Sequence, residues 1–193
     1  TRQPFKLINT NLPANAIKSL VTDMMQEAAQ SLLQLTGAAG YRRDQFAGRA
    51  IVDCRPFQIF EGSNDILYEQ VAETVIKGMQ RSGAAKVSEY LGELEIGRKA
   101  ADRVRDLFDF SIDGSLPQRK AVSLGQALAR TIGLHMVVAL GERGFSRDLV
   151  ERTAGVLRRS VARCLGGFHA ELRTPFVHEY RADAHWRAFA AQG

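Results

Sequence analysis

Apolar residues recur at three- and four-residue intervals along most of this chain, and that spacing constrains its fold more than any other feature. It predicts helices over residues 14–36, 45–54, 63–78, 84–110, 117–142 and 147–165. Such spacing places apolar side chains on one side of a helix. No stretch alternates with period two, so strands are not expected. We therefore predict an all-α fold, a helical bundle followed by a second helical region.

The sequence also predicts the apolar face of the first helix and the places where glycines interrupt or end later ones. In the first, one apolar face is traced by Ile17, Leu20, Val21, Met24, Ala28, Leu32 and Leu35. Asp23 and Glu27 lie off that face, at an i, i+4 spacing. Interruptions are expected near Gly92 or Gly97, whereas Gly125 and Gly133 inside one helix indicate close contacts between helices. Gly166-Gly167 is expected to end the last helix.

Composition excludes several classes of protein. The 193 residues are 45% hydrophobic with a net charge of +5, which fits a soluble domain or a large part of one. No long basic block occurs, so no nucleic-acid partner is expected. Cys54 and Cys164 lie far apart without a CxxC pair, and the histidines do not form metal-binding spacings, so neither a disulfide framework nor a metal site is indicated. These features indicate a reducing, cytoplasmic location, and no apolar run reaches the length of a transmembrane helix.

One segment, Phe57–Ile66, has the features of a reactive site. An apolar run meets a carboxylate at Glu61, and a helix follows with Ser63 as its predicted N-cap and Asp65 in its first turn. Glu61 then lies just outside a helix N-terminus, beside Phe60, where a base can be partly desolvated and backbone N–H groups point at an incoming oxygen. The alternative is an ordinary capping turn with no chemistry.

Three segments in this order resemble the C-terminal helical domain of the acyl-CoA dehydrogenase family. Gln34–Tyr41 resembles its Q-x-x-G-G-x-G-Y loop, Arg49–Arg55 its R-x-x-R-D-x-R segment, and Phe57–Ile66 its I-Y-E-G-T-x-E/Q-I segment. Ala38 and Val52 depart from the pattern, and Val52 removes a charge. The resemblance covers about residues 14–79, so residues 1–80 are expected to form the last part of that domain. Residues 81–193 resemble the extension of the very-long-chain members.

The resemblance implies an enzyme, an acyl-CoA dehydrogenase that uses FAD to oxidise the Cα–Cβ bond of an acyl-CoA thioester. It implies Glu61 as the base that removes the α-proton, with hydride passing to flavin N5, and the Glu61 N–H as donor to the thioester carbonyl. It places Phe60 and Gly62 at the substrate. The residues that it assigns to FAD are Gln34, Gly37, Gly40, Ser63 and Asp65.

The resemblance also implies partners. The N-terminal helical and middle β-domains of the family are not in this sequence, which lacks a starting Met, so we expect one part of a larger polypeptide or complex. A homodimer or tetramer, electron-transfer flavoprotein as acceptor, and a role in fatty acid β-oxidation (in the mitochondrial matrix if the source is eukaryotic) follow by resemblance. The extension suggests peripheral membrane contact. Two alternatives stay open: a flavin oxidase or N-hydroxylase on the same scaffold, and a non-catalytic helical assembly domain.

Overall fold

The structure, a computed structural model, describes residues 11–42 and 44–170, and within these ranges it contains seven α-helices and no strand. The helices are α1 (Leu12–Thr36), α2 (Phe46–Cys54), α3 (Asn64–Ser82), α4 (Val87–Glu93), α5 (Arg98–Val104), α6 (Gln118–Glu142) and α7 (Arg147–His169). Short 3₁₀ turns are η1 (Gly37–Tyr41), η2 (Arg55–Gln58) and η3 (Arg105–Leu107). The all-α prediction is confirmed, and the 84–110 stretch divides into α4 and α5 as expected.

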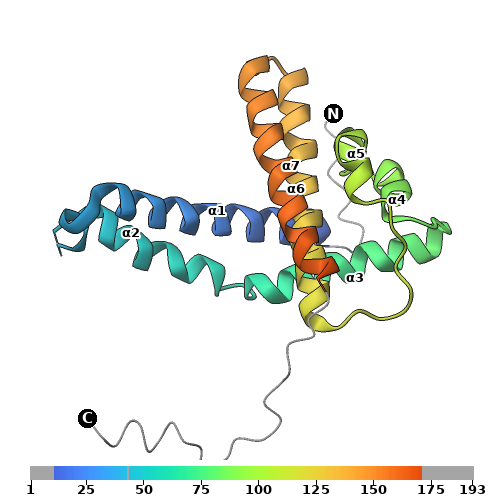
Figure 1. Cartoon of the computed structure of the whole chain (residues 1–193), viewed down its shortest axis with the longest axis horizontal. Coiled ribbons are helices and arrows are strands. Elements are labelled where there is room, and N and C mark those ends of the chain that lie inside the picture. Colours follow the sequence, from blue (N-terminus) through green and yellow to red (C-terminus); the bar gives the residue numbers. More distant parts are fainter. Residues whose placement is uncertain (1–10, 43, 171–193) are drawn as a thin grey trace, which may run out of the picture.

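The long helices cross in the middle of the molecule (Figure 1). α2 folds back along α1, and α3 continues in the same direction as α2. The α6–α7 hairpin crosses α1 and α3, and α5 packs against α6. The turn between η2 and α3, which contains Glu61, is therefore held close to α1.

One hydrophobic core joins these helices. Its fully buried side chains include Tyr68, Val71, Val75, Leu91, Leu124, Leu128 and Val161. Burying a side chain of this size stabilises a fold by about 1.5–3 kcal/mol. Leu12 and Ala16 of α1 belong to the same core. The helices after residue 81 thus pack directly on the helices that position Glu61.

Glycines let α6 approach its neighbours closely, as the sequence predicts. A Cβ atom added at Gly125 would overlap the backbone carbonyl of Tyr68 on α3. A Cβ atom added at Gly133 would lie 2.6 Å from Cδ2 of Leu20 on α1. Gly125 faces backbone, which cannot move aside alone, whereas Gly133 faces the end of a flexible side chain. Gly125 therefore sets the distance between α3 and α6.

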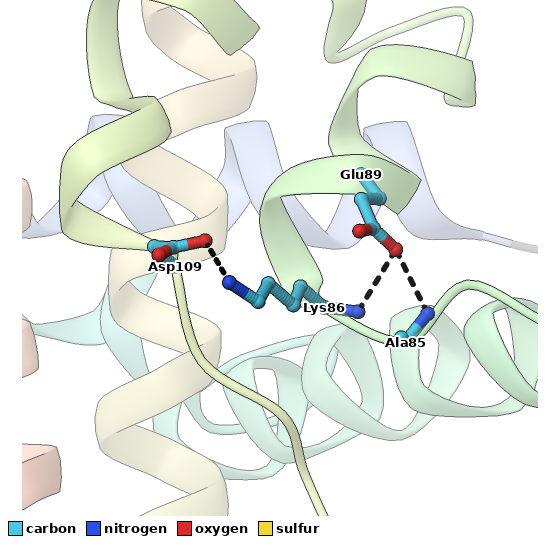
Figure 2. A network of polar contacts seen from close by, with 4 residues as sticks. All are labelled: Ala85, Lys86, Glu89 and Asp109. Atoms are coloured by element: carbon cyan, nitrogen blue, oxygen red, sulfur yellow. Dashed lines mark hydrogen bonds and ion pairs between the residues drawn. The ribbon is translucent and has the colours of Figure 1, made fainter.

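The start of α4 is held by a small polar network (Figure 2). Glu89 folds back over the first turn and accepts hydrogen bonds from the N–H groups of Ala85 and Lys86, at 2.9 and 3.2 Å. The Lys86 ammonium donates to Asp109 at 2.7 Å, and this hydrogen bond raises the pKa of Lys86. The Lys86–Asp109 pair ties the segment after η3 to the start of α4.

Replacing Glu89 should weaken this end of α4. Glu89→Ala removes the acceptor of two N–H groups that have no partner within the helix, so we expect the free energy of unfolding to fall by about 1 kcal/mol. Glu89→Gln keeps an acceptor oxygen and should cost less. Denaturant unfolding of the two variants measures the difference. Equal losses for both would contradict a capping role.

The apolar face of α1 is covered at Ile17 and Leu20, but most of it is exposed. Val21 and Leu35 are 53% and 87% exposed, and Met24, Ala28 and Leu32 are exposed as well. The buried face of α1 contains the polar side chains of Ser19, Thr22 and Gln26 beside Leu20. α2, α3 and α6 pack on this mixed side of α1, whereas no described helix covers Val21, Met24 or Leu35.

Several predicted helix ends also differ. α3 continues to Ser82 beyond the predicted limit of residue 78, and the helical segment predicted to reach residue 110 ends with η3 at Leu107. α2 ends at Cys54 as expected, but Arg55 keeps helical dihedral angles (φ −57°, ψ −42°) and η2 continues from it. α7 runs through Gly166-Gly167 to His169. Phe168 is buried and its ring stacks on that of Phe110, with centroids 5.3 Å apart. Packing of Phe168 offsets the low helix propensity of the glycine pair.

α6 is long and apolar enough to cross a membrane by length and composition alone, but 61% of its most apolar window is buried in the fold. Its apolar residues, such as Leu124, Leu128 and Ile132, belong to the core. α6 is therefore explained as a central core helix, and among the described residues no other helix meets the same criteria.

Candidate active site

The turn that carries Glu61 has an unusual backbone. Glu61 has φ +58° and Gly62 has φ +96°, and among the described residues Glu61 is the one non-glycine residue with positive φ. The left-handed region is unfavourable for a side chain with a Cβ atom, and residues held there are concentrated at functional sites. Gly62 suits its place, since few other residues adopt its conformation. The turn thus requires support from its surroundings.

Lys18 of α1 supplies part of that support. Its ammonium Nζ donates to the Gly62 carbonyl oxygen at 2.9 Å and to Oδ1 of Asn64 at 3.0 Å. Asn64 is buried, and its Nδ2 donates back to the Ser19 carbonyl and to Oγ1 of Thr22 at 3.2 and 2.9 Å. The first residue of α3 is therefore fastened to α1 by its side chain.

Asp23 of α1 is the second support. Its carboxylate accepts hydrogen bonds from Gln58 Nε2 at 2.8 Å, Asn64 Nδ2 at 2.5 Å and the Tyr68 hydroxyl at 2.6 Å. Burial, followed by the hydrogen bond to Asp23, raises the pKa of Tyr68 well above its usual value, so this phenol stays a donor. Gln58 precedes the Glu61 turn and Asn64 follows it. We call Lys18 and Asp23, with their partners Gln58, Asn64 and Tyr68, the turn clamp.

Glu61 itself faces outward. Glu61 is exposed, and Phe60 beside it is 67% exposed. The expected partial desolvation of the Glu61 carboxylate is therefore wrong for the described part of the chain. Phe57, Ile59 and Ile66, which precede and follow Glu61 in the chain, are exposed as well. A molecule covering this exposed turn would exclude water from the carboxylate.

The other predicted residues of this segment lie where the sequence suggests, with one difference. Ser63 is the N-cap of α3 and Asp65 lies in its first turn. The Ser63 hydroxyl makes no capping hydrogen bond, so that part of the prediction is wrong. The entry to α3 is fixed by the buried Asn64 side chain, which bonds to α1 instead.

The predicted glycine loop lies at the far end of α1. Gly37 ends α1 with φ +64°, directly after the predicted helix limit of residue 36, while Gln34 is exposed. Gly40 is buried, and a Cβ atom added there would lie 2.5 Å from Leu33 Cδ1. Gln34 is eleven residues beyond Asp23, about 16 Å along a helix. The two groups of predicted residues thus form separate surfaces on this chain.

A cavity of about 500 Å³ opens beside this loop. Its lining comprises Leu33, Gly40, Tyr41, Arg42, Gly48, Arg49, Ile51, Val52 and Asp53. Apolar walls suit an aromatic ring, and the two arginines suit phosphate groups. The donor set therefore fits part of a dinucleotide such as the adenine half of FAD. No residue of the Glu61 turn lines this cavity.

Other titratable groups give no second site. In the described ranges, no group of three or more His, Cys, Asp or Glu could hold a metal ion. His135 lies half-buried in α6, and burial lowers its pKa. Its Nδ1 accepts a hydrogen bond from the Lys99 N–H at 3.3 Å. His135 therefore takes part in the contact between α5 and α6. His178 and His185 lie outside the described residues.

The turn clamp is not evident from the sequence. Nothing in the sequence distinguishes Lys18 from other surface lysines, and the helical spacing shows only that Asp23 lies off the apolar face. The available signal was the run of polar residues Lys18, Ser19, Thr22, Asp23 and Gln26 at helical spacing. In a long helix such a stripe is typical of a solvated face, so only the tertiary contacts distinguish it from one.

Comparison with known proteins supports the resemblance for the first part of the chain. The family model described as acyl-CoA dehydrogenase, C-terminal domain, matches residues 6–76. No curated protein and no solved structure matches the chain. The matched segment includes α1, the glycine loop, α2, the Glu61 turn and most of α3. This segment, which is less than half of the chain, is therefore similar to the C-terminal domain of the acyl-CoA dehydrogenases, a family of flavin-dependent dehydrogenases.

Proposed function

We propose that this chain supplies the catalytic base of a flavin-dependent acyl-CoA dehydrogenase, with Glu61 removing the α-proton of the acyl thioester. The observation that carries the proposal is the conformation of the Glu61 turn. Glu61 has a left-handed backbone, is exposed, and stands on a turn held by the turn clamp. An ordinary capping turn does not require a strained glutamate.

The residues of the turn have distinct proposed roles. The Glu61 carboxylate takes the proton, and its backbone N–H donates to the thioester carbonyl, where negative charge develops. Gly62 lets the backbone approach the substrate, and Phe60 contributes apolar surface beside the carboxylate. FAD, when bound, supplies an acceptor for the β-hydrogen as hydride. Removing water from Glu61 on substrate binding would increase its strength as a base.

We assign FAD contacts to two surfaces. Ser63 and Asp65 at the start of α3 belong to the first, and Gln34, Gly37 and Gly40 beside the 500 Å³ cavity belong to the second. The separation of these surfaces along α1 is consistent with one FAD that contacts two copies of the chain. Asp65 would bind a hydroxyl or a backbone group, since a carboxylate repels phosphate.

The proposal extends to the assembly. The exposed apolar side of α1, with Val21, Met24 and Leu35, suits further helices of the acyl-CoA dehydrogenase architecture. We propose a homodimer or tetramer in which residues 1–80 carry the site and residues 81–193 support it. Electron-transfer flavoprotein as acceptor, a place in fatty acid β-oxidation, a cytoplasmic or mitochondrial-matrix location and peripheral membrane contact remain proposals by resemblance.

The test is reduction of bound flavin by substrate. The chain is co-expressed with a polypeptide that supplies the N-terminal and β-domains, and the absorption spectrum is followed when a saturated acyl-CoA is added without oxygen. The wild-type flavin bands should bleach. Glu61→Gln should bind acyl-CoA but bleach about 10²–10⁴-fold more slowly, because the amide cannot take the α-proton.

Glu73→Gln on the exposed side of α3 is the matched control and should bleach at the wild-type rate. Bleaching of Glu61→Gln at the wild-type rate would refute Glu61 as the base. A colourless assembly that ignores added FAD would favour the non-catalytic assembly domain. Rapid reoxidation of the reduced flavin by oxygen would favour the oxidase or N-hydroxylase alternative.

A further inference from the structure

Two successive residues with positive φ make the Glu61 turn costly to maintain. Glu61 and Gly62 have φ +58° and +96°. A non-glycine residue in the left-handed region persists only where its surroundings hold it there. The exposed side chains of Phe60 and Glu61 cannot provide that hold. The contacts that can do so lie on the opposite side of the turn, toward α1.

Those contacts reach the turn from both ends. Asp23 accepts from Gln58 before the turn, and from Asn64 and Tyr68 after it, at 2.5–2.8 Å. Lys18 reaches the interior of the turn, because its ammonium donates to the Gly62 carbonyl at 2.9 Å. Hydrogen bonds to a charged partner are stronger than neutral ones. α1 therefore holds the backbone immediately after Glu61 and both flanks of the turn.

We propose that Lys18 and Asp23 are positioning residues that set the backbone of Glu61 and Gly62 before substrate binds; the catalytic consequence rests on the proposed function. Both side chains belong to α1 and hold the turn by hydrogen bonds to Gly62, Asn64 and Gln58. Lys18 holds the Gly62–Ser63 peptide and Asp23 holds Gln58 on the other side, so the Glu61 backbone between them is restrained at both ends. The rate benefit would come from preorganisation, since the turn need not rearrange when substrate arrives.

Lys18 is the better residue for a test. It is half-buried, and its contacts go to one carbonyl and one amide oxygen, both within or next to the turn. Lys18→Met keeps the length and most of the apolar stem of the side chain but removes the donor and the charge. The core residues of α1, such as Leu12, Ala16 and Leu20, stay unchanged.

The first readout is hydrogen exchange of the full chain without ligand. In Lys18→Met, amide exchange in the peptide spanning residues 60–68 should accelerate about tenfold or more, because a charged hydrogen bond holding the turn is lost. Exchange in α6 and α7 should stay at the wild-type rate. Lys77→Met is the matched control, since Lys77 lies on the exposed side of α3 and, among the described residues, pairs with Glu73. It should leave the 60–68 peptide unchanged.

The second readout is flavin reduction in the co-expressed assembly. Lys18→Met should lower the rate at saturating acyl-CoA about tenfold, with little change in half-saturating concentration, because the base is misplaced while the binding surface remains. A merely structural role would lower the yield of folded protein, but the folded fraction would keep the wild-type rate at saturating acyl-CoA. Should Lys18→Met fail to fold, Lys18→Gln, which keeps a shorter donor, replaces it.

Unchanged exchange in the 60–68 peptide of Lys18→Met overturns the inference whatever the kinetics. Faster exchange with an unchanged rate at saturating substrate overturns the positioning role. When the wild-type assembly itself shows no substrate-dependent bleaching, the proposed function fails. Hydrogen exchange then decides by itself whether Lys18 holds the Glu61 turn. The two experiments therefore distinguish failure of the inference from failure of the proposed function.

Discussion

Gly125→Ala is expected to lower the free energy of unfolding by about 2 kcal/mol or more, although alanine is the better helix former. The added Cβ would overlap the backbone carbonyl of Tyr68, so α3 and α6 would have to separate. Overpacking of a well-filled core typically costs about 1–3 kcal/mol and occasionally more. A clash with backbone belongs to the upper end of that range, so about 2 kcal/mol or more remains after a helix-propensity gain of about 1 kcal/mol. In a chain of this size the melting temperature should fall by about 5 °C or more.

Gly166→Ala is the matched control for this prediction. Gly166 also lies inside a long helix, α7, but a Cβ there would meet no atom within 4 Å. Its substitution should therefore raise stability by roughly 0.5–1 kcal/mol. Thermal or denaturant unfolding measures both variants. Stabilisation of both would show that α3 and α6 separate without cost, contrary to the packing described here.

Asp23→Ala is expected to lower the free energy of unfolding by about 1–3 kcal/mol, the second large effect. The carboxylate accepts hydrogen bonds from Gln58, Asn64 and Tyr68, and the last two residues are buried. The Tyr68 hydroxyl would lose its acceptor, and a buried donor without a partner costs about 1–3 kcal/mol, whereas the Asn64 amide would keep Ser19 and Thr22 as acceptors. Asp23→Asn keeps one acceptor oxygen and should cost less. The loss should be accompanied by faster hydrogen exchange at the start of α3.

Glu27→Ala tests whether this cost comes from the contacts of Asp23. Glu27 is the next carboxylate along α1, one turn later, and it is exposed. Its replacement should change the free energy of unfolding by no more than about 0.5 kcal/mol. Denaturant unfolding compares the two variants directly. A similar loss at both positions would mean that α1 responds to lost charge in general, and the turn clamp would contribute little.

The Glu61 turn could be located from the sequence because its signals are local. An apolar run, a glutamate, a glycine and a helix start follow one another, and helix starts depend on neighbouring residues. The strain at Glu61 could not be anticipated in the same way. Its φ of +58° depends on contacts with Lys18 and Asp23, which lie about forty residues earlier in the chain.

The sequence by itself determined the helical periodicity, most helix limits and the close contact at Gly125, because each depends on residue type and short-range spacing. Only the tertiary structure decided which side of α1 is buried. The apolar side chains of Val21, Met24 and Leu35 are exposed. α3 and α6 pack instead on the side of α1 that contains Ser19, Leu20 and Thr22. Burial depends on which neighbouring helices pack on a helix, and the spacing of apolar residues within that helix does not identify those neighbours. The polar side of α1 could be buried because Asn64 and Tyr68 satisfy its charged and hydroxyl groups.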